Sequence, residues 1–382
     1  MRSFFYTIVL ILFTGCGHFL DDYSQDLVVP KTVSDLNEIL LGNGYIPSWE
    51  VKYLRNGSIG WQLNILDDDV NTVIAYNAMK GSPEMDGTYY GYTSWQMEVG
   101  RNHSGNNLAA DNANWDGLYQ RINSMNIVLH ELGNVSQNTE QDKLDALRVE
   151  AECHFLRAQF YFLLVNMYAK AYDPDNAASE LGVPLKLTYY VEHDKEKDTQ
   201  FERTPVAKVY EQIVKDLNES IVCFEKSPQT KSFYRASKEA ALLLLSRVYL
   251  YMQDWKNAEI TAKELLAEKS SLLDYSKLVN NPVEYAISES SPELLFSQGS
   301  LSLENDFTGA GGDFCISQDL FQLYDTMDYR RDVYFGRSVQ SDSIGLNRKY
   351  KMGEHRSSVS DLFTLRTAEG YLNAAEACAM QG

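Results

Sequence analysis

Cysteine, proline and basic residues are all scarce in this chain. Its 382 residues include five cysteines and nine prolines, and 34 lysines and arginines stand against 53 aspartates and glutamates. No cysteine belongs to a CxxC pair or to the Cys/His spacing of a zinc site, and the spacings indicate no disulfide framework. The net charge of −19 gives a surface that repels phosphate backbones, so nucleic acid is not expected as a partner.

Long hydrophobic runs are also missing, apart from one near the N-terminus. Phe4–Phe13 is mostly apolar and follows the positive charge of Arg2, but it falls far short of the ~20 residues that a membrane-spanning helix needs. It is typical of the apolar part of a signal peptide. The small residue Gly15 then precedes Cys16, as in a bacterial lipobox. This order predicts a lipoprotein signal peptide over residues 1–15, lipid attachment at Cys16 and a soluble, tethered body.

Two residues depart from the usual lipobox. Phe13 and Thr14 stand where such sequences more often carry Leu and Ala or Ser. The alternative is an ordinary secretory signal in which Cys16 is incidental. After the cysteine, Gly17–Pro30 is polar and acidic, and we expect it to serve as the tether.

The local signatures of common catalytic sites are absent as well. The sequence has no GxSxG, no HExxH and no phosphate-binding glycine-rich loop. Asp67–Asp69 with Asn71 resembles the start of a calcium loop, but Thr72 and Ala78 stand where glycine and glutamate are needed. We therefore expect no metal and no cofactor. A carboxylate pair for glycoside hydrolysis stays open, because its separation of roughly 5–10 Å is a property of the tertiary structure.

Helical periodicity, by contrast, is abundant. Apolar residues recur every three or four positions from Trp115 to Leu129 and again from about Thr139 to Ala171, where one buried face is expected. A third helix should follow Thr204, which would cap it, with Pro205 in its first position. A shorter helix should begin at Thr32 or at the serine two positions later.

Some reactive side chains fall within these helical patterns. His154 lies beside the buried face of the second helix, and we interpret it as a packing histidine with satisfied polar atoms. For Cys153, Cys223 and Cys378 a buried free thiol is the simplest interpretation. Disulfides stay possible in an exported protein.

Residues 235–268 fit the template of a tetratricopeptide-type pair of helices, which repeats every ~34 residues. The small and aromatic positions of this template are filled by Ser246, Tyr249, Ala258 and Ala262. The small residues allow the two helices to approach closely, while Tyr249 should fill the groove between them. Asp254-Trp255 is expected to form the turn.

The same spacing recurs at the end of the chain. Tyr371, Ala374-Ala375 and Cys378 match the first helix of such a pair, and Gly382 falls where its turn should start. The partner helix is missing from the sequence. We therefore expect a C-terminally truncated fragment of a longer protein.

A larger pattern is visible when separate segments are taken in chain order. They are Cys16 with Phe19-Leu20-Asp21, Trp115 with Tyr119 and Asn126, Phe155-Leu156-Arg157-Ala158 with Tyr161 and Tyr168, Gly182-Val183-Pro184-Leu185, Arg203-Thr204-Pro205 with Asp216, Arg235-Ala236-Ser237, Leu323-Tyr324-Asp325 with Asp328 and Arg330, and Leu365-Arg366 with Glu369 and Tyr371. This combination spans essentially the whole chain. It resembles the SusD/RagB family of outer-membrane nutrient-binding lipoproteins of Bacteroidetes. Ala169 departs from the family, which often has Gly after Tyr168, and the family's usual C-terminal portion is absent.

The resemblance implies an all-α fold, an α–α superhelix of tetratricopeptide-like repeats with a large, irregular, loop-rich ligand-binding part. On this basis we divide the chain into a signal peptide at 1–15, a tether and loop-rich region at 16–112, a helical region at 113–268 and an incomplete C-terminal region at 269–382.

The resemblance also implies a function. A member would sit on the outer membrane facing outside, capture a glycan without catalysis and deliver it to a SusC-like TonB-dependent transporter. A peptide-binding RagB-like lipoprotein of the same architecture is the alternative, and a lipoprotein glycoside hydrolase is a more distant one.

Aromatic residues supply the candidates for ligand binding. The chain has 25 tyrosines, 16 phenylalanines and five tryptophans. Flat aromatic faces suit stacking on sugar rings, while nearby Asp, Asn or Arg groups can bond the hydroxyls. We expect the ligand-binding residues among Tyr89, Tyr90, Tyr92, Trp95, Arg101 and Phe307. The alternative for each aromatic residue is that it packs the loops onto the helices.

Overall fold

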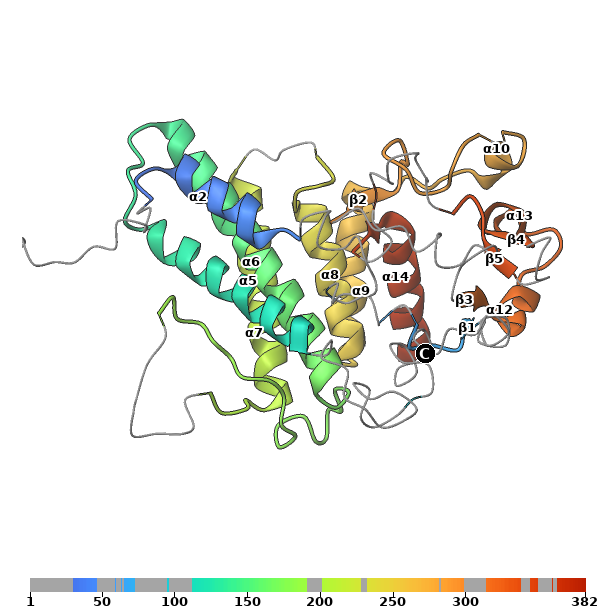
Figure 1. Ribbon diagram of the computed structural model, residues 1–382, viewed down its shortest axis with the longest axis horizontal. Helices are drawn as coiled ribbons and strands as arrows, with labels where there is room; N and C mark the ends of the chain where they lie inside the picture. Colours follow the sequence, from blue (N-terminus) through green and yellow to red (C-terminus); the bar gives the residue numbers. More distant parts are fainter. Residues whose placement is uncertain are drawn as a thin grey trace, which may run out of the picture.

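Successive long helices pack side by side along most of the molecule (Figure 1). The computed structural model describes residues 30–46, 59, 63, 65–72, 95, 112–190, 201–227, 232–281, 283–298, 314–337, 344–349, 359 and 363–382. Its long helices are α5 (Asn112–Glu131), α6 (Glu140–Tyr168), α7 (Val206–Lys226), α8 (Lys238–Tyr251), α9 (Trp255–Glu268) and α14 (Thr367–Gln381). Each contacts the next in this order. The expected all-α fold class is confirmed.

Two helices begin with the same local device. The short helix α2 (Val33–Ile39) continues into one π-helical turn, η2 (Leu40–Gly44). Thr32 starts α2, because its side chain accepts a hydrogen bond from the Asp35 N–H while the Asp35 carboxylate accepts one from the Thr32 N–H. Thr139 and Asp142 form the same capping box at α6. Both predicted helix starts are confirmed, and each box satisfies N–H groups that the helix leaves unpaired.

The predicted pair of helices at 235–268 is α8 and α9. Ser246, Ala258 and Ala262 are fully buried, so small side chains do lie between the two helices. Asp254 caps α9 through its side chain, as a turn residue should. Trp255 is the first residue of α9 and does not belong to the turn. Tyr249 is half-buried against the core, so it fills the groove only in part.

Other details of the helices differ from the sequence-based expectation. α6 does not bury a single stripe: nearly every residue from Ala151 to Val165 is buried, because α5 and α7 cover it on both sides. Thr204 does not cap α7; Pro205 stands at the N-cap, and the Thr204 hydroxyl accepts from the Leu185 N–H instead. Cys378 is exposed on α14, whereas the thiols of the two other helical cysteines are buried as expected.

A smaller part lies beyond α14 and contains short strands that the sequence does not predict (Figure 1). Its elements are β1 (Val70–Thr72), α10 (Tyr275–Val279), β3 (Phe314–Ile316), α12 (Gln318–Leu323), α13 (Tyr329–Tyr334), β4 (Phe335–Arg337) and β5 (Ile344–Leu346). The antiparallel strands run in the order β1-β3-β5-β4, with Val70 opposite Ile316 and Phe335 opposite Leu346. A second, two-stranded sheet pairs β2 (Leu294–Phe296) with β6 (Leu365–Arg366).

Gly182 lies where two segments between α6 and α7 pair with each other, one around Gly182 and the other around Thr204. Its N–H donates to the Thr204 carbonyl at 2.7 Å, and the Thr204 N–H donates to the Val183 carbonyl at 3.2 Å. A Cβ at position 182 would lie 2.8 Å from the Thr204 carbonyl oxygen and 3.2 Å from the Val206 Cα. Both are backbone atoms, which cannot turn aside as a side chain can.

Gly182→Ala is therefore expected to lower the free energy of unfolding by about 1–3 kcal/mol, the usual cost of overpacking. Chemical denaturation of the purified chain measures it. Gly42→Ala is the matched control, because a Cβ there meets nothing within 4 Å and an alanine favours the helix. Equal stability of the two variants would contradict the close approach at Gly182.

Candidate functional site

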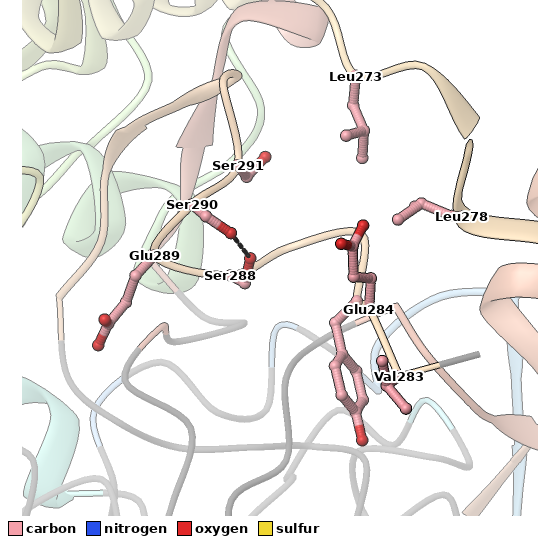
Figure 2. Close-up of a pocket in the computed structure, with 9 residues that line it drawn as sticks. Leu273, Leu278, Val283, Glu284, Ser288, Glu289, Ser290 and Ser291 are labelled. Carbon is pink, nitrogen blue, oxygen red and sulfur yellow. Dashed lines mark hydrogen bonds between the residues drawn. The ribbon is translucent and has the colours of Figure 1, made fainter. Parts of the chain in front are cut away.

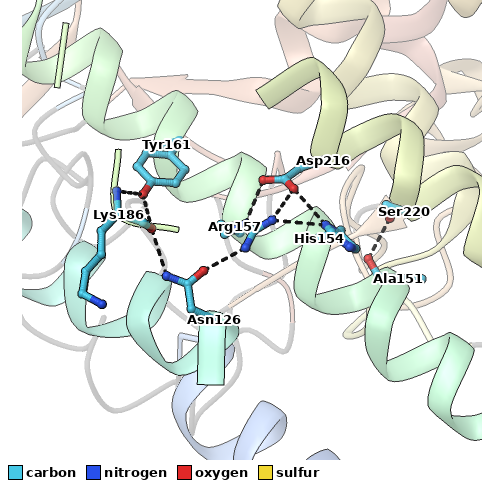
Figure 3. A network of polar contacts seen from close by, with 8 residues as sticks. All are labelled: Asn126, Ala151, His154, Arg157, Tyr161, Lys186, Asp216 and Ser220. Atoms are coloured by element: carbon cyan, nitrogen blue, oxygen red, sulfur yellow. Dashed lines mark hydrogen bonds and ion pairs between the residues drawn. The ribbon is translucent and has the colours of Figure 1, made fainter. Parts of the chain in front are cut away.

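A network of charged side chains crosses the interior of the helical array (Figure 3). The Arg157 guanidinium on α6 donates two hydrogen bonds to the carboxylate of Asp216 on α7, at 2.9 and 2.6 Å. It donates a third, at 2.8 Å, to the side-chain oxygen of Asn126 on α5. His154 Nδ1 lies 2.8 Å from the same carboxylate. The four side chains thus tie three helices together.

The carboxyl group of Asp216 is fully buried. Burial alone would raise its pKa, but the hydrogen bonds from His154 and Arg157 and the charge of Arg157 outweigh burial and hold the pKa below the usual value of 3.8. Asp216 is therefore ionised and acts as the counter-charge of Arg157. His154 has a partner and little exposure, so its interpretation as a packing histidine is confirmed.

The same network holds the segment after α6 in place. The Asn126 amide donates to the carbonyls of Lys186 and Thr188, at 2.9 and 3.3 Å. The Tyr161 hydroxyl donates to the Lys186 carbonyl at 2.7 Å and accepts from the Lys186 N–H at 2.8 Å. These groups are already paired with one another, so the network supports the fold and presents no free catalytic group.

A second buried carboxylate lies earlier in α6. Glu152 receives hydrogen bonds from Arg235 and from the Tyr45 hydroxyl, while Arg235 also donates to the Asn37 side chain. Burial raises the pKa of Glu152, and the attraction of Arg235 and the Tyr45 hydrogen bond offset this only in part. This cluster fastens α2 and the loop before α8 to α6.

One pocket of about 340 Å³ is lined by the segment between α9 and β2, which includes α10 (Figure 2). Its volume falls in the range of roughly 300–1,000 Å³ that small-molecule sites occupy. The lining residues are Leu273, Leu278, Val283, Glu284, Tyr285, Ser288, Glu289, Ser290 and Ser291. Sequence reasoning missed it; the available signal was the polar run Ser288-Glu289-Ser290-Ser291 between two apolar segments.

Of the aromatic residues proposed for ligand binding, the structure describes Trp95. Its side chain is 64% exposed, and its φ of 55° places a bulky residue in the left-handed region. That conformation is unusual outside glycine and often accompanies a functional role. The remaining predicted residues, Tyr89, Tyr90, Tyr92, Arg101, Phe307 and the lipid-attachment residue Cys16, lie outside the described residues.

Comparison with known proteins finds one family to which the chain is similar. Residues 63–250 match a family model, SusD-like, whose description is starch-binding associating with outer membrane. SusD-like protein P25 of Formosa agariphila is 24% identical over 288 residues, which cover 73% of this chain and 49% of that protein. A SusD superfamily structure from Bacteroides thetaiotaomicron matches with a TM-score of 0.69 at 21% identity, over 92% of this chain and 77% of that one. These matches support a SusD/RagB family protein.

Another solved SusD-like fold carries a functional name. Surface glycan-binding protein A from Bacteroides fluxus has a TM-score of 0.60 at 17% identity, over 92% of this chain and 77% of that one. The SusD-like chain spans about half the length of the curated relative it matches. In its described parts no helix is both long and apolar enough to cross a membrane.

Asp216→Asn tests the interior network. Removing one partner leaves the Arg157 charge buried without compensation, so the free energy of unfolding should fall by about 3–5 kcal/mol at pH 7. Glu140→Gln is the control, because its pair with Lys143 lies at the surface and should contribute under about 1 kcal/mol.

The effect of Asp216→Asn should also depend on pH. The folded pKa of Asp216 is depressed, so the carboxylate's contribution is complete above the unfolded value of 3.8 and is lost as the pH falls through the lower folded value. Urea denaturation between pH 7 and the acid limit of folding measures this. A stability difference that grew on acidification would refute the assignment.

Proposed function

We propose that this protein is a surface lipoprotein that captures glycan and delivers it to a SusC-like TonB-dependent transporter. The observation that carries the proposal is the match of residues 63–250 to a family described as starch-binding and outer-membrane associated. The helical array would serve as the rigid body, and the loop-rich parts would hold the ligand. The protein would act outside the cell, anchored through acylated Cys16, and would perform no catalysis.

The exposed Trp95 supports this function from within the chain. A tryptophan that exposes most of its surface in a strained backbone position offers a flat apolar face to a sugar ring. The interior charged groups of the array are used in the fold, as the Arg157–Asp216 pair illustrates. Binding without turnover is therefore the function that we infer.

Trp95→Ala is expected to weaken glycan binding by about tenfold, the loss typical of an aromatic anchor. A glycan array followed by calorimetry on the soluble chain starting at Gly17 identifies the glycan and measures the loss. Phe201→Ala removes another exposed aromatic side chain and should leave the affinity unchanged. Release of new reducing ends from the glycan, or retention of peptides in place of glycans, would contradict the proposal.

Cys16→Ala tests the anchor. The variant should lose incorporation of labelled palmitate and leave the membrane fraction, because no acyl chain would remain to hold the protein. Cys378→Ala, at an exposed thiol, should keep both properties. Labelling of the Cys16→Ala protein would refute lipid attachment at this residue.

A further inference from the structure

The pocket at residues 273–291 has two chemically different walls. Leu273 and Leu278 form an apolar side, whereas Ser288, Ser290 and Ser291 line the other (Figure 2). A sugar ring has the same division, with apolar C–H faces and polar hydroxyl edges. The shape and size of the pocket therefore suit a single small polyhydroxylated group better than a purely apolar one.

Hydrogen-bonding capacity is left over on the serine wall. The hydroxyls of Ser288 and Ser290 lie 3.0 Å apart and share one hydrogen bond, so one proton and several lone pairs stay available. The Ser291 hydroxyl oxygen is buried, and it makes no hydrogen bond within the described part of the chain. Burial without a partner is unfavourable, and a ligand hydroxyl would supply the missing one.

The charge of the pocket has one sign. Its lining includes Glu284 and Glu289 and, among the described residues, no lysine or arginine. The Glu284 carboxylate points into the space between the two walls (Figure 2). Tyr234 donates a hydrogen bond to the Glu289 carboxylate, whereas the Glu284 carboxylate has no hydrogen bond or ion pair with any described residue. An anionic group would meet this unneutralised carboxylate.

The pocket is also held in a fixed shape. Arg348 donates to the carbonyls of Leu278, Asn281 and Glu284, at 2.8, 2.8 and 3.3 Å, from behind the loop. On the other side the buried Glu293 carboxylate accepts from the Leu273 N–H at 2.7 Å. A site that is rigid before binding loses less entropy when it binds.

We propose that this pocket is a sugar subsite that accepts an uncharged or amino-bearing sugar residue and rejects uronic acids and sulfated sugars. The proposal rests on the glycan-binding function and adds its selectivity. Glu284 sets that selectivity, and the serine wall binds the hydroxyls. Trp95 is not among the residues that line this pocket.

The test uses the chain from Gly17 onward with matched monosaccharides: glucose with glucuronate, galactose with galacturonate, and glucosamine. Crystals soaked in each sugar locate it, and protein-observed NMR titration measures the affinity. We expect a neutral or amino sugar in the pocket, and uronates at least about fivefold weaker. Glu284→Gln should improve uronate binding by about three- to tenfold and change neutral binding little, whereas Glu219→Gln on α7 should change neither.

Ser291→Ala separates a binding role from a structural one. It removes an unpaired buried hydroxyl, so the melting temperature should not fall, while the affinity for the neutral sugar should drop about fivefold. An empty pocket with every sugar, a uronate that binds as well as its neutral partner, or unchanged affinity in Ser291→Ala overturns the subsite. If the unmodified chain still binds a polysaccharide and the Trp95→Ala variant does not, only the subsite proposal has failed. If the unmodified chain binds no glycan, the proposed function has failed too.

Discussion

Arg157 and Asp216 place opposite charges in the interior of the protein, and their pairing constrains the packing around them. α6 is buried on nearly all sides over Ala151–Val165, so the Arg157 guanidinium is largely shielded from water and needs an anion nearby. Asp216 supplies that anion from α7, and the Asn126 side chain on α5 accepts a further hydrogen bond from Arg157. The relative positions of α5, α6 and α7 are therefore constrained, because Arg157 and Asp216 pair only when the helices are aligned in this way.

Arginines repeat this role where the chain is irregular. Loops have no ladder of backbone hydrogen bonds, so their carbonyls need other donors. Arg203 donates to the carbonyls of Gly182 and Leu181, and Arg348 donates to three carbonyls of the segment behind the pocket. Arg247 on α8 makes a two-point contact with Glu369 on α14. A planar fork of donors can hold several acceptors in one geometry, which a lysine cannot do.

The sequence predicts the features that depend on local chemistry. The helix starts near Thr32 and Thr139, and the small residues between α8 and α9, depend on residues a few positions apart and were predicted from the sequence. The four-stranded sheet was not predicted. Each of its strands has three residues, which is too short for a periodic signal, and β1 pairs with β3 across more than half the chain. The pocket was missed for a different reason: its lining residues lie close together in sequence, but a short polar run such as Ser288–Ser291 is common in loops and does not by itself indicate a cavity.

This division places stability and ligand preference in different parts of the molecule. The Arg157–Asp216 and Arg235–Glu152 ion pairs lie inside the array, where a change would disturb the packing of the helices. The pocket loop is fixed mainly through its backbone carbonyls, which are the same for every residue type, so side chains such as Glu284 are free to change without loss of the support from Arg348. The fold is shared with solved structures at only 17–21% identity, and loop side chains generally tolerate more change than the elements that they connect. Ligand selectivity should therefore depend on the charge and shape of the loop side chains, and little on the sequence of the helices.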